Sequence, residues 1–196
     1  MSITAIAEEA RLYTPEDLLS LPDGKRYELV DGRLMERYMG AESSSVGGRL
    51  FLRIGMFNEE HRRGTVFPAD NGYQCFAHSR KLVRRPDVSF VKEERLPGDR
   101  LPTGWIRIAP DLAVEVISPK DRAEELQSKL EDYRKARVPL VWVIYPQARV
   151  ALVYRPDGPP TELSENDELT GEDVLPGFRC PLREILPPAP AVEVAD

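Results

Sequence analysis

The sequence contains little cysteine or histidine and no long apolar run. Two cysteines and two histidines occur among its 196 residues. Cys75 and Cys180 stand apart without a CxxC pair, so the sequence predicts neither a zinc site nor a disulfide framework. No stretch approaches the roughly 20 apolar residues of a membrane span, and the N-terminus lacks the basic-then-apolar pattern of a secretory signal. We therefore expect a soluble, cytoplasmic protein without a membrane partner.

An excess of basic residues is also lacking. The chain has 27 Lys and Arg against 33 Asp and Glu, a formal charge of -6 and a pI near 5.2. Such a chain has no overall attraction for a polyanion, so binding to nucleic acid requires a local basic patch or a bridging metal. The phosphate-binding pattern GxxxxGK[ST] is absent, which argues against an ATP-driven motor in this chain.

The apolar content is sufficient for one domain. Hydrophobic residues make up 41% of the sequence. A chain of this length can bury its own core, and we predict a single domain over residues 1–186. Residues 187–196 are rich in Pro and Ala and have no periodicity, so we predict a flexible tail there.

Strands and helices are predicted in alternation along this domain. Asp31-Gly32 suits the positive backbone angles of a type I′ turn, which predicts an N-terminal β-hairpin over residues 27–36. Apolar residues at helical spacing predict a helix from Ser43 to about Glu60, with Gly64 as its stop. Further strands are predicted at residues 65–67, 73–76, 83–91, 112–118, 140–144 and 149–154.

A second helix is predicted directly after the strand at residues 112–118. Ser118 is suited to the N-cap and Pro119 to the first helical position. The residues predicted to face inward are Leu126, Leu130, Tyr133 and Arg137. The order strand, helix, strand predicts a crossover between parallel strands, and residues 149–154 alternate as an antiparallel strand does. The predicted fold class is therefore α/β, with a mixed β-sheet core flanked by helices.

Two carboxylates are placed where strands should be buried. Glu115 lies in the middle of an apolar strand, and Asp87 follows Pro86 at the start of another. An ionised group in such a strand is costly unless it is paired or bound to a metal. Two acids on neighbouring strands could converge to hold a divalent cation for hydrolysis. Glu115 could instead pair with a buried arginine, and Asp87 could simply begin its strand.

These motifs together resemble the Uma-type restriction endonuclease family of the PD-(D/E)xK nuclease superfamily. The residues that carry the likeness are Pro86-Asp87, Glu115-Val116-Ile117-Ser118-Pro119, Lys129 and Tyr133, with the hairpin from Tyr27 to Gly32 and the segment Gly40-Ala41-Glu42-Ser43. The resemblance spans roughly residues 27–182. It implies a restriction-endonuclease-like fold and metal-dependent cleavage of DNA.

The resemblance also implies roles for individual residues. Asp87 and Glu115 would bind Mg²⁺ or Mn²⁺, and Glu42 would complete the cage or hold a second metal. The superfamily has a lysine two positions after the acid, but Ile117 stands there in this chain. The resemblance assigns the basic role to Lys129 on the following helix, where it would orient a water or offset charge in the transition state.

Several interpretations stay open at this level. Glu42 could act only on the helix N-terminus, Lys129 could pair with Glu125 on its own helix, and Glu28 could point inward or outward. Arg49 and Arg53 would face phosphates if their helix borders a cleft. Cutting both strands of a duplex favours a homodimer. Alternative functions are a degenerate nuclease fold that binds nucleic acid or protein, and hydrolysis of another phosphoester.

Overall fold

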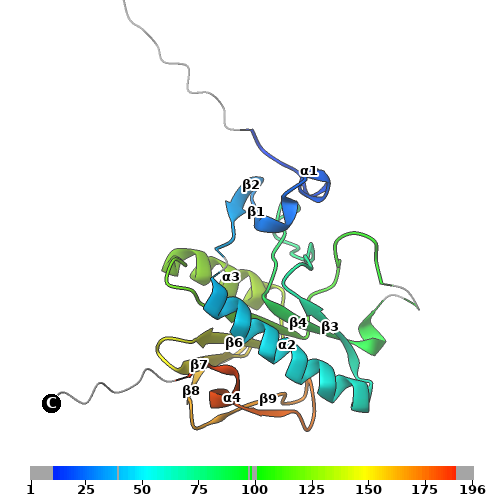
Figure 1. Cartoon of the computed structure of the whole chain (residues 1–196). Coiled ribbons are helices and arrows are strands. Elements are labelled where there is room, and N and C mark those ends of the chain that lie inside the picture. The colour runs from blue at the N-terminus through cyan, green and yellow to red at the C-terminus, as the bar shows by residue number, and fades with distance from the viewer. Residues whose placement is uncertain (1–10, 39, 97, 99–100, 189–196) are drawn as a thin grey trace, which may run out of the picture.

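A six-stranded mixed β-sheet forms the centre of the fold (Figure 1). The computed structural model describes residues 11–38, 40–96, 98 and 101–188, so most of the predicted tail lies outside the described residues. The strand order is β3, β4, β5, β6, β7, β8. Their bounds are Gly64–Pro68, Val88–Lys92, Leu112–Val116, Leu140–Tyr145, Val150–Tyr154 and Thr161–Ser164. Only the β5–β6 pair is parallel in this sheet, which confirms the predicted mixed sheet.

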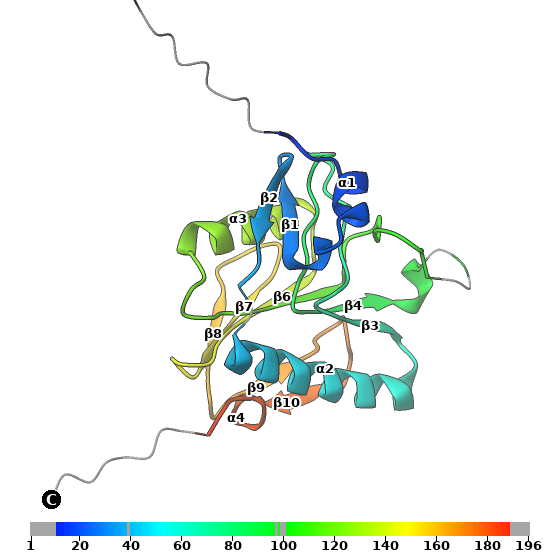
Figure 2. The ribbon, with the colours of Figure 1, turned by 45° about the horizontal axis from the view of Figure 1, so that its top comes forward.

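Helices cover both faces of this sheet, as Figure 2 shows. Helix α2 (Ala41–His61) packs Val46, Leu50 and Ile54 against one face, together with β9 (Glu168–Thr170), β10 (Arg179–Pro181) and α4 (Leu182–Ile185). Helix α3 (Ala123–Lys135) covers the other face and buries Tyr133 there. Because side chains alternate along a strand, Val114 and Val116 of β5 point to α2, whereas Glu115 points to α3.

The N-terminal elements lie over the α3 side of the sheet. Helix α1 (Pro15–Ser20) begins with a capping box, in which the Asp17 N–H donates to the Thr14 hydroxyl at 3.1 Å. The predicted hairpin is confirmed as β1 (Tyr27–Val30) and β2 (Arg33–Glu36), joined by Asp31 and Gly32 at φ of 49° and 83°. Two short 3₁₀ turns complete the elements, Gly24–Arg26 and Glu93–Arg95.

Some predicted element boundaries are wrong. Helix α3 starts at Ala123, because Asp121 accepts the Ser118 N–H at 2.6 Å and closes a turn where the helix start was predicted. Arg137 lies beyond the end of α3 with a positive φ and is exposed, so it is not part of the inward face. Residues 73–76 form no strand, and Tyr73 makes only isolated bridges to Arg84 and Ile106. The predicted strand at 83–91 is regular only from Val88.

Gly64 has a packing role instead of the predicted helix-stop role. Helix α2 ends at His61 and is followed by Arg62 in the left-handed conformation. A Cβ on Gly64 would lie 2.1 Å from the Val91 carbonyl oxygen, so only glycine allows β3 to approach β4 this closely. Within the described residues, no helix is both long and apolar enough to cross a membrane.

Candidate active site

Glu115 faces α3 and is held there by two donors. The ammonium of Lys129 donates to its Oε2 at 2.9 Å, and the Tyr133 hydroxyl donates to its Oε1 at 2.6 Å. Lys129 reaches inward from α3, as the role that the resemblance assigns to it requires. The alternative partner for Lys129, Glu125, is not the one it contacts here, because its ion pairs are with Glu115 and Glu28.

Asp87 lies beside Glu115 across the sheet. Strands β4 and β5 are antiparallel with Val88 opposite Val114, and continuing this register by one residue places Asp87 opposite Glu115. Residues opposite each other on antiparallel strands project to the same face. The Val116 N–H donates to Asp87 Oδ2 at 2.8 Å, and Arg37 Nη2 donates to Oδ1 at 3.1 Å. The backbone of β5 therefore fixes the position of the second carboxylate.

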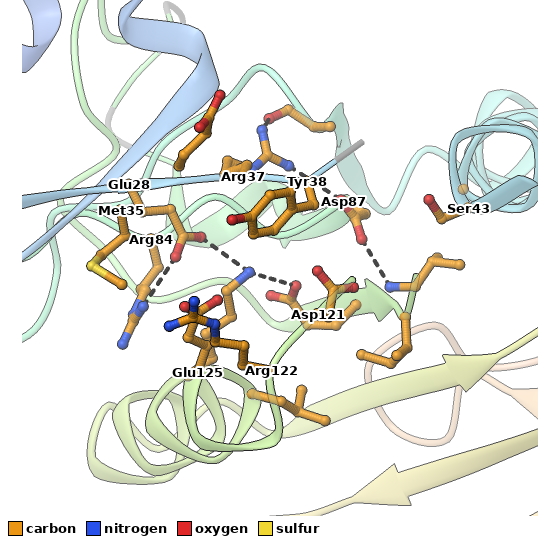
Figure 3. A pocket seen from close by; sticks show the side chains of 18 of the residues that line it. Glu28, Met35, Arg37, Tyr38, Ser43, Arg84, Asp87, Asp121, Arg122 and Glu125 are labelled. Carbon is orange, nitrogen blue, oxygen red and sulfur yellow. Dashed lines mark hydrogen bonds and ion pairs between the residues drawn. The ribbon is translucent and has the colours of Figure 1, made fainter. Parts of the chain in front are cut away.

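Both carboxylates line one pocket, shown in Figure 3. It has a volume of about 410 Å³ and lies between the hairpin, the start of α2 and the start of α3. Lys129 also lines it and keeps 18% of its side chain exposed. The structure thus brings together three of the four residues expected at the site: Asp87, Glu115 and Lys129.

Glu42 is not brought to this pocket. It lies on the first turn of α2 with its side chain exposed, whereas Ser43 and Ser44 line the pocket. Successive helical residues point about 100° apart, so a position one residue away faces a different direction. The expectation that Glu42 completes the cage therefore has no support from its placement.

Glu28 joins the site from the hairpin, although the sequence left its direction open. The Arg85 N–H donates to its Oε1 at 2.8 Å, and the Lys129 ammonium lies 3.3 Å from the same oxygen. Arg84 Nη1 donates to the other oxygen, Oε2, at 3.0 Å. Lys129 therefore lies between two buried carboxylates, those of Glu28 and Glu115.

Arg84 was missed as a member of the site and connects Glu28 to α3. Its guanidinium donates to Asp132 Oδ2 at 2.8 Å and to Ser128 Oγ at 2.8 Å, and the residue is 3% exposed. His78 is also bonded to Asp132, at 2.9 Å. The sequence did contain a sign of this role, because Arg84 and Arg85 are two charged residues inside a predicted strand, directly before Pro86.

Replacing Arg84 with methionine should destabilise the protein strongly. The change leaves Glu28 and Asp132 buried with one counter-charge fewer, and breaking a buried ion pair costs roughly 3–5 kcal/mol. Urea unfolding monitored by circular dichroism measures the loss. Arg134→Met is the matched control, because Arg134 makes an exposed pair with Glu131, and both residues lie on the surface of α3. Equal stability of the two variants would show that the buried pairs around Arg84 contribute little.

The charges at the site shift one another's protonation. Burial raises the pKa of Glu115 to about 7; Lys129 opposes this, while the nearby Asp87 and Glu28 add to it. Burial also raises the pKa of Asp87. Burial alone would raise the pKa of Glu28, but Lys129 and Arg84 lower it to about 2. The ionised forms of Asp87 and Glu115 are therefore disfavoured in the pocket, and a bound cation would stabilise both.

The basic residues Arg49 and Arg53 of α2 face away from this pocket. Arg49 donates to the Leu186 carbonyl at 2.8 Å, and Arg53 pairs with Glu184 of α4 at 2.8 Å. The expectation that they meet phosphates at a cleft is therefore wrong for this pocket. They instead attach α2 to the C-terminal segment.

The donor atoms of the pocket suit a hard divalent cation. Asp87 and Glu115 offer carboxylate oxygens, which Mg²⁺ and Mn²⁺ prefer over softer ligands. In the part of the chain that the structure describes, no three His, Cys, Asp or Glu side chains are grouped as a complete metal cage. Mg²⁺ is commonly held by one or two carboxylates together with waters and substrate phosphates, so a pair of carboxylates fits this mode.

Comparison with known proteins agrees with the fold and the motifs. The chain is similar to the crystal structure of a putative nuclease belonging to DUF820 from Anabaena variabilis ATCC 29413, with a TM-score of 0.73 and 21% identity over 88% of this chain and 96% of that chain. No curated protein matches. Residues 15–183 match the Uma2 family, described as "Putative restriction endonuclease". The resemblance and the fold class expected from the sequence are confirmed, and the chain belongs to the Uma2 family.

Proposed function

We propose that this protein is a metal-dependent endonuclease that hydrolyses phosphodiester bonds in DNA. The observation that carries the proposal is the meeting of Asp87 and Glu115 in one pocket, with Lys129 bonded to Glu115 at 2.9 Å. The family and the fold point to a restriction-endonuclease-like nuclease. The proposal adds the metal, the DNA substrate and the roles of these residues.

Asp87 and Glu115 would hold Mg²⁺ or Mn²⁺. Such a cation, when bound, polarises a phosphate and lowers the pKa of a bound water. The Val116 N–H and Tyr133 hydroxyl each bond one oxygen of a carboxylate and so fix the direction of the remaining lone pairs. Fixed ligands reduce the reorganisation that the reaction requires.

Lys129 would supply the basic group that Ile117 cannot. Its ammonium lies at the Glu115 carboxylate although it comes from α3, and it remains partly exposed to the pocket. Burial alone would lower the pKa of Lys129, but Glu115, Glu28 and Asp87 together raise it, so the side chain stays protonated. A protonated amine can donate to an attacking water or to a phosphate oxygen, and it can offset negative charge in the transition state.

Metal binding and cleavage should both depend on Asp87. We expect Mn²⁺ to bind the intact chain in calorimetry and to bind Asp87→Asn at least roughly 10-fold more weakly, since the variant loses a charged ligand. Cleavage of duplex and single-stranded DNA should stop with a chelator. Asp157→Asn is the control, because Asp157 is an exposed carboxylate in a surface pair with Arg137.

The other outcomes identify the alternatives. Metal binding without DNA cleavage would point to hydrolysis of another phosphoester. An absence of metal binding would contradict the proposal and leave a nuclease fold that binds nucleic acid or protein. Cleavage that survives the chelator would exclude the metal.

We further propose that the protein acts as a homodimer in the cytoplasm. Two symmetry-related sites are the simplest means of cutting both strands of a duplex. Sedimentation of the intact chain with and without duplex DNA measures the number of copies. A single copy in both conditions would contradict the dimer and leave the chemistry of the site unaffected.

A further inference from the structure

Two consecutive glycines of helix α2, Gly47 and Gly48, line the pocket, so the helix presents no side chains there. Apart from the chain neighbours and the backbone of α2 itself, no described atom lies within 4 Å of the position that a Cβ on Gly48 would take, and a Cβ on Gly47 would make only ordinary contacts at 3.9 Å. Glycine is a poor residue inside a helix because it leaves the unfolded chain more freedom. Packing within the chain explains neither glycine, so the space they leave serves something outside the fold.

Aromatic and apolar side chains surround this space. Tyr38 lines the pocket and is 42% exposed. The apolar residues nearby on the pocket lining are Met35, Phe51, Pro68, Ile117 and Leu126. Such side chains offer nothing to a phosphate, but they suit the flat face of a nucleobase, which stacks on aromatic rings regardless of its sequence.

The charge of the pocket disfavours a long duplex inside it. Among the described residues that line the pocket, seven are acidic and four are basic. A paired duplex carries a phosphate about every 1.7 Å of its axis, which would be repelled by this excess of carboxylates. One nucleotide brings few phosphates, and a volume of about 410 Å³ is in the range of pockets that hold small ligands.

We propose that the pocket receives one unpaired nucleotide of a DNA strand, so that the preferred substrate contains a single-stranded or frayed segment. The base would lie against Tyr38, and the sugar-phosphate backbone would pass along Gly47 and Gly48 toward Asp87 and Glu115. This inference rests on the proposed nuclease function and specifies its substrate. The bare surface of α2 is where the strand approaches the helix.

The test combines stability with substrate preference in two glycine variants. Gly48→Ala should raise the melting temperature, by about 2–4 °C for a chain of this size, because alanine favours the helix. The same variant should cleave a duplex with a short unpaired gap roughly 10-fold more slowly. Gly55→Ala is the matched control, because a Cβ there would also meet no described atom within 4 Å beyond its chain neighbours and the backbone of α2, but Gly55 does not line the pocket. It should gain stability and keep its activity.

Substrate comparison provides the second arm. The intact chain should cleave the gapped duplex at least roughly 10-fold faster than the fully paired one, and Tyr38→Ala should reduce that preference because a stacked base is lost. Equal cleavage of paired and gapped DNA, or equal activity of Gly48→Ala and Gly55→Ala, would overturn the inference.

Binding separates this inference from the nuclease proposal. Fluorescence anisotropy with labelled paired and gapped DNA is measured on the same variants. If no DNA is cleaved, the nuclease proposal fails, whereas a preference for gapped DNA that Gly48→Ala removes still supports the nucleotide pocket. If DNA is cleaved but bound equally well in both forms, the nuclease proposal stands and the nucleotide pocket is wrong.

Discussion

Glu115→Gln is expected to gain stability relative to the intact chain as the pH rises from 5 to 8, although it loses activity. The pKa of Glu115 is raised from its ordinary value of 4.5 to about 7, chiefly by burial. Between these values the folded protein keeps a proton that the unfolded chain has lost, so this group lowers folding stability progressively as the pH rises. Above pH 7 the loss is complete. Because glutamine cannot ionise, the variant does not lose folding stability in this way.

Thermal unfolding with EDTA at pH 5, 6, 7 and 8 measures this effect. The variant's melting temperature relative to the intact chain should rise by several degrees, since one pKa unit corresponds to about 1.4 kcal/mol and each kcal/mol to about 2–4 °C. Glu131→Gln is the control, because Glu131 is at the surface of α3 in a pair with Arg134 and has its pKa lowered to about 2. A melting-temperature difference that does not change with pH would show that the folded protein does not disfavour the ionised form of Glu115.

The same variant should lose the response to metal. Under the proposed function, Mn²⁺ would bind the folded site and not the unfolded chain, so it should raise the melting temperature of the intact chain but not that of Glu115→Gln. Cleavage should fall by on the order of 10³-fold, as for the loss of a group that stabilises transition-state charge. A residue that costs stability and carries activity is what a functional site is expected to contain. Full cleavage by the variant would remove Glu115 from the proposed mechanism.

Features that depend on neighbouring residues were predictable from the sequence. The hairpin follows from Asp31-Gly32, because both residues tolerate the positive φ of the turn. The cap of α1 follows from Thr14 and Asp17, which bond each other's backbone. Glu115 was conspicuous because a carboxylate is rare in a strand that is otherwise wholly apolar. In each case, the determining interaction is local or is set by burial alone.

Features that depend on contacts distant in sequence were not predictable. Glu28 and Arg84 are 56 positions apart and meet only because the hairpin folds over α3. Glu42 was expected to be a metal ligand and the direction of Glu28 was left open, but packing placed Glu42 outside the pocket and Glu28 inside it. The start of α3 was displaced because Asp121 bonds the Ser118 N–H in a turn, which the same residues could equally have done as a helix cap.

Lys129→Met is expected to cause a large loss of stability at alkaline pH. Lys129 pairs with Glu115 at 2.9 Å and with Glu28 at 3.3 Å, and all three side chains are largely buried. Removing the cation leaves two carboxylates close to each other with less compensation, which should cost roughly 3–5 kcal/mol at pH 8. The loss should be smaller at pH 5, where Glu115 is protonated in the folded state and does not require a counter-charge.

A double variant separates the charge pair from the rest of the side chain. Lys129→Met combined with Glu115→Gln should recover much of the stability, because one of the two carboxylates is then neutral; the difference from additivity gives the coupling energy. Lys135→Met is the control, since Lys135 makes an exposed pair on the same helix. Additive effects would show that Lys129 and Glu115 do not stabilise each other.

The activity of Lys129→Met then determines whether this lysine replaces the one missing at Ile117. Assays at pH 6, where the variant should be closer in stability to the intact chain, separate the chemical role from unfolding. A folded variant that binds Mn²⁺ but cleaves at least roughly 100-fold more slowly would assign the basic role to Lys129, since the metal ligands would be intact. A folded variant with unchanged cleavage would show that the two carboxylates suffice. In that case the role of Lys129 would be only to stabilise the buried carboxylates of Glu28 and Glu115 by its positive charge.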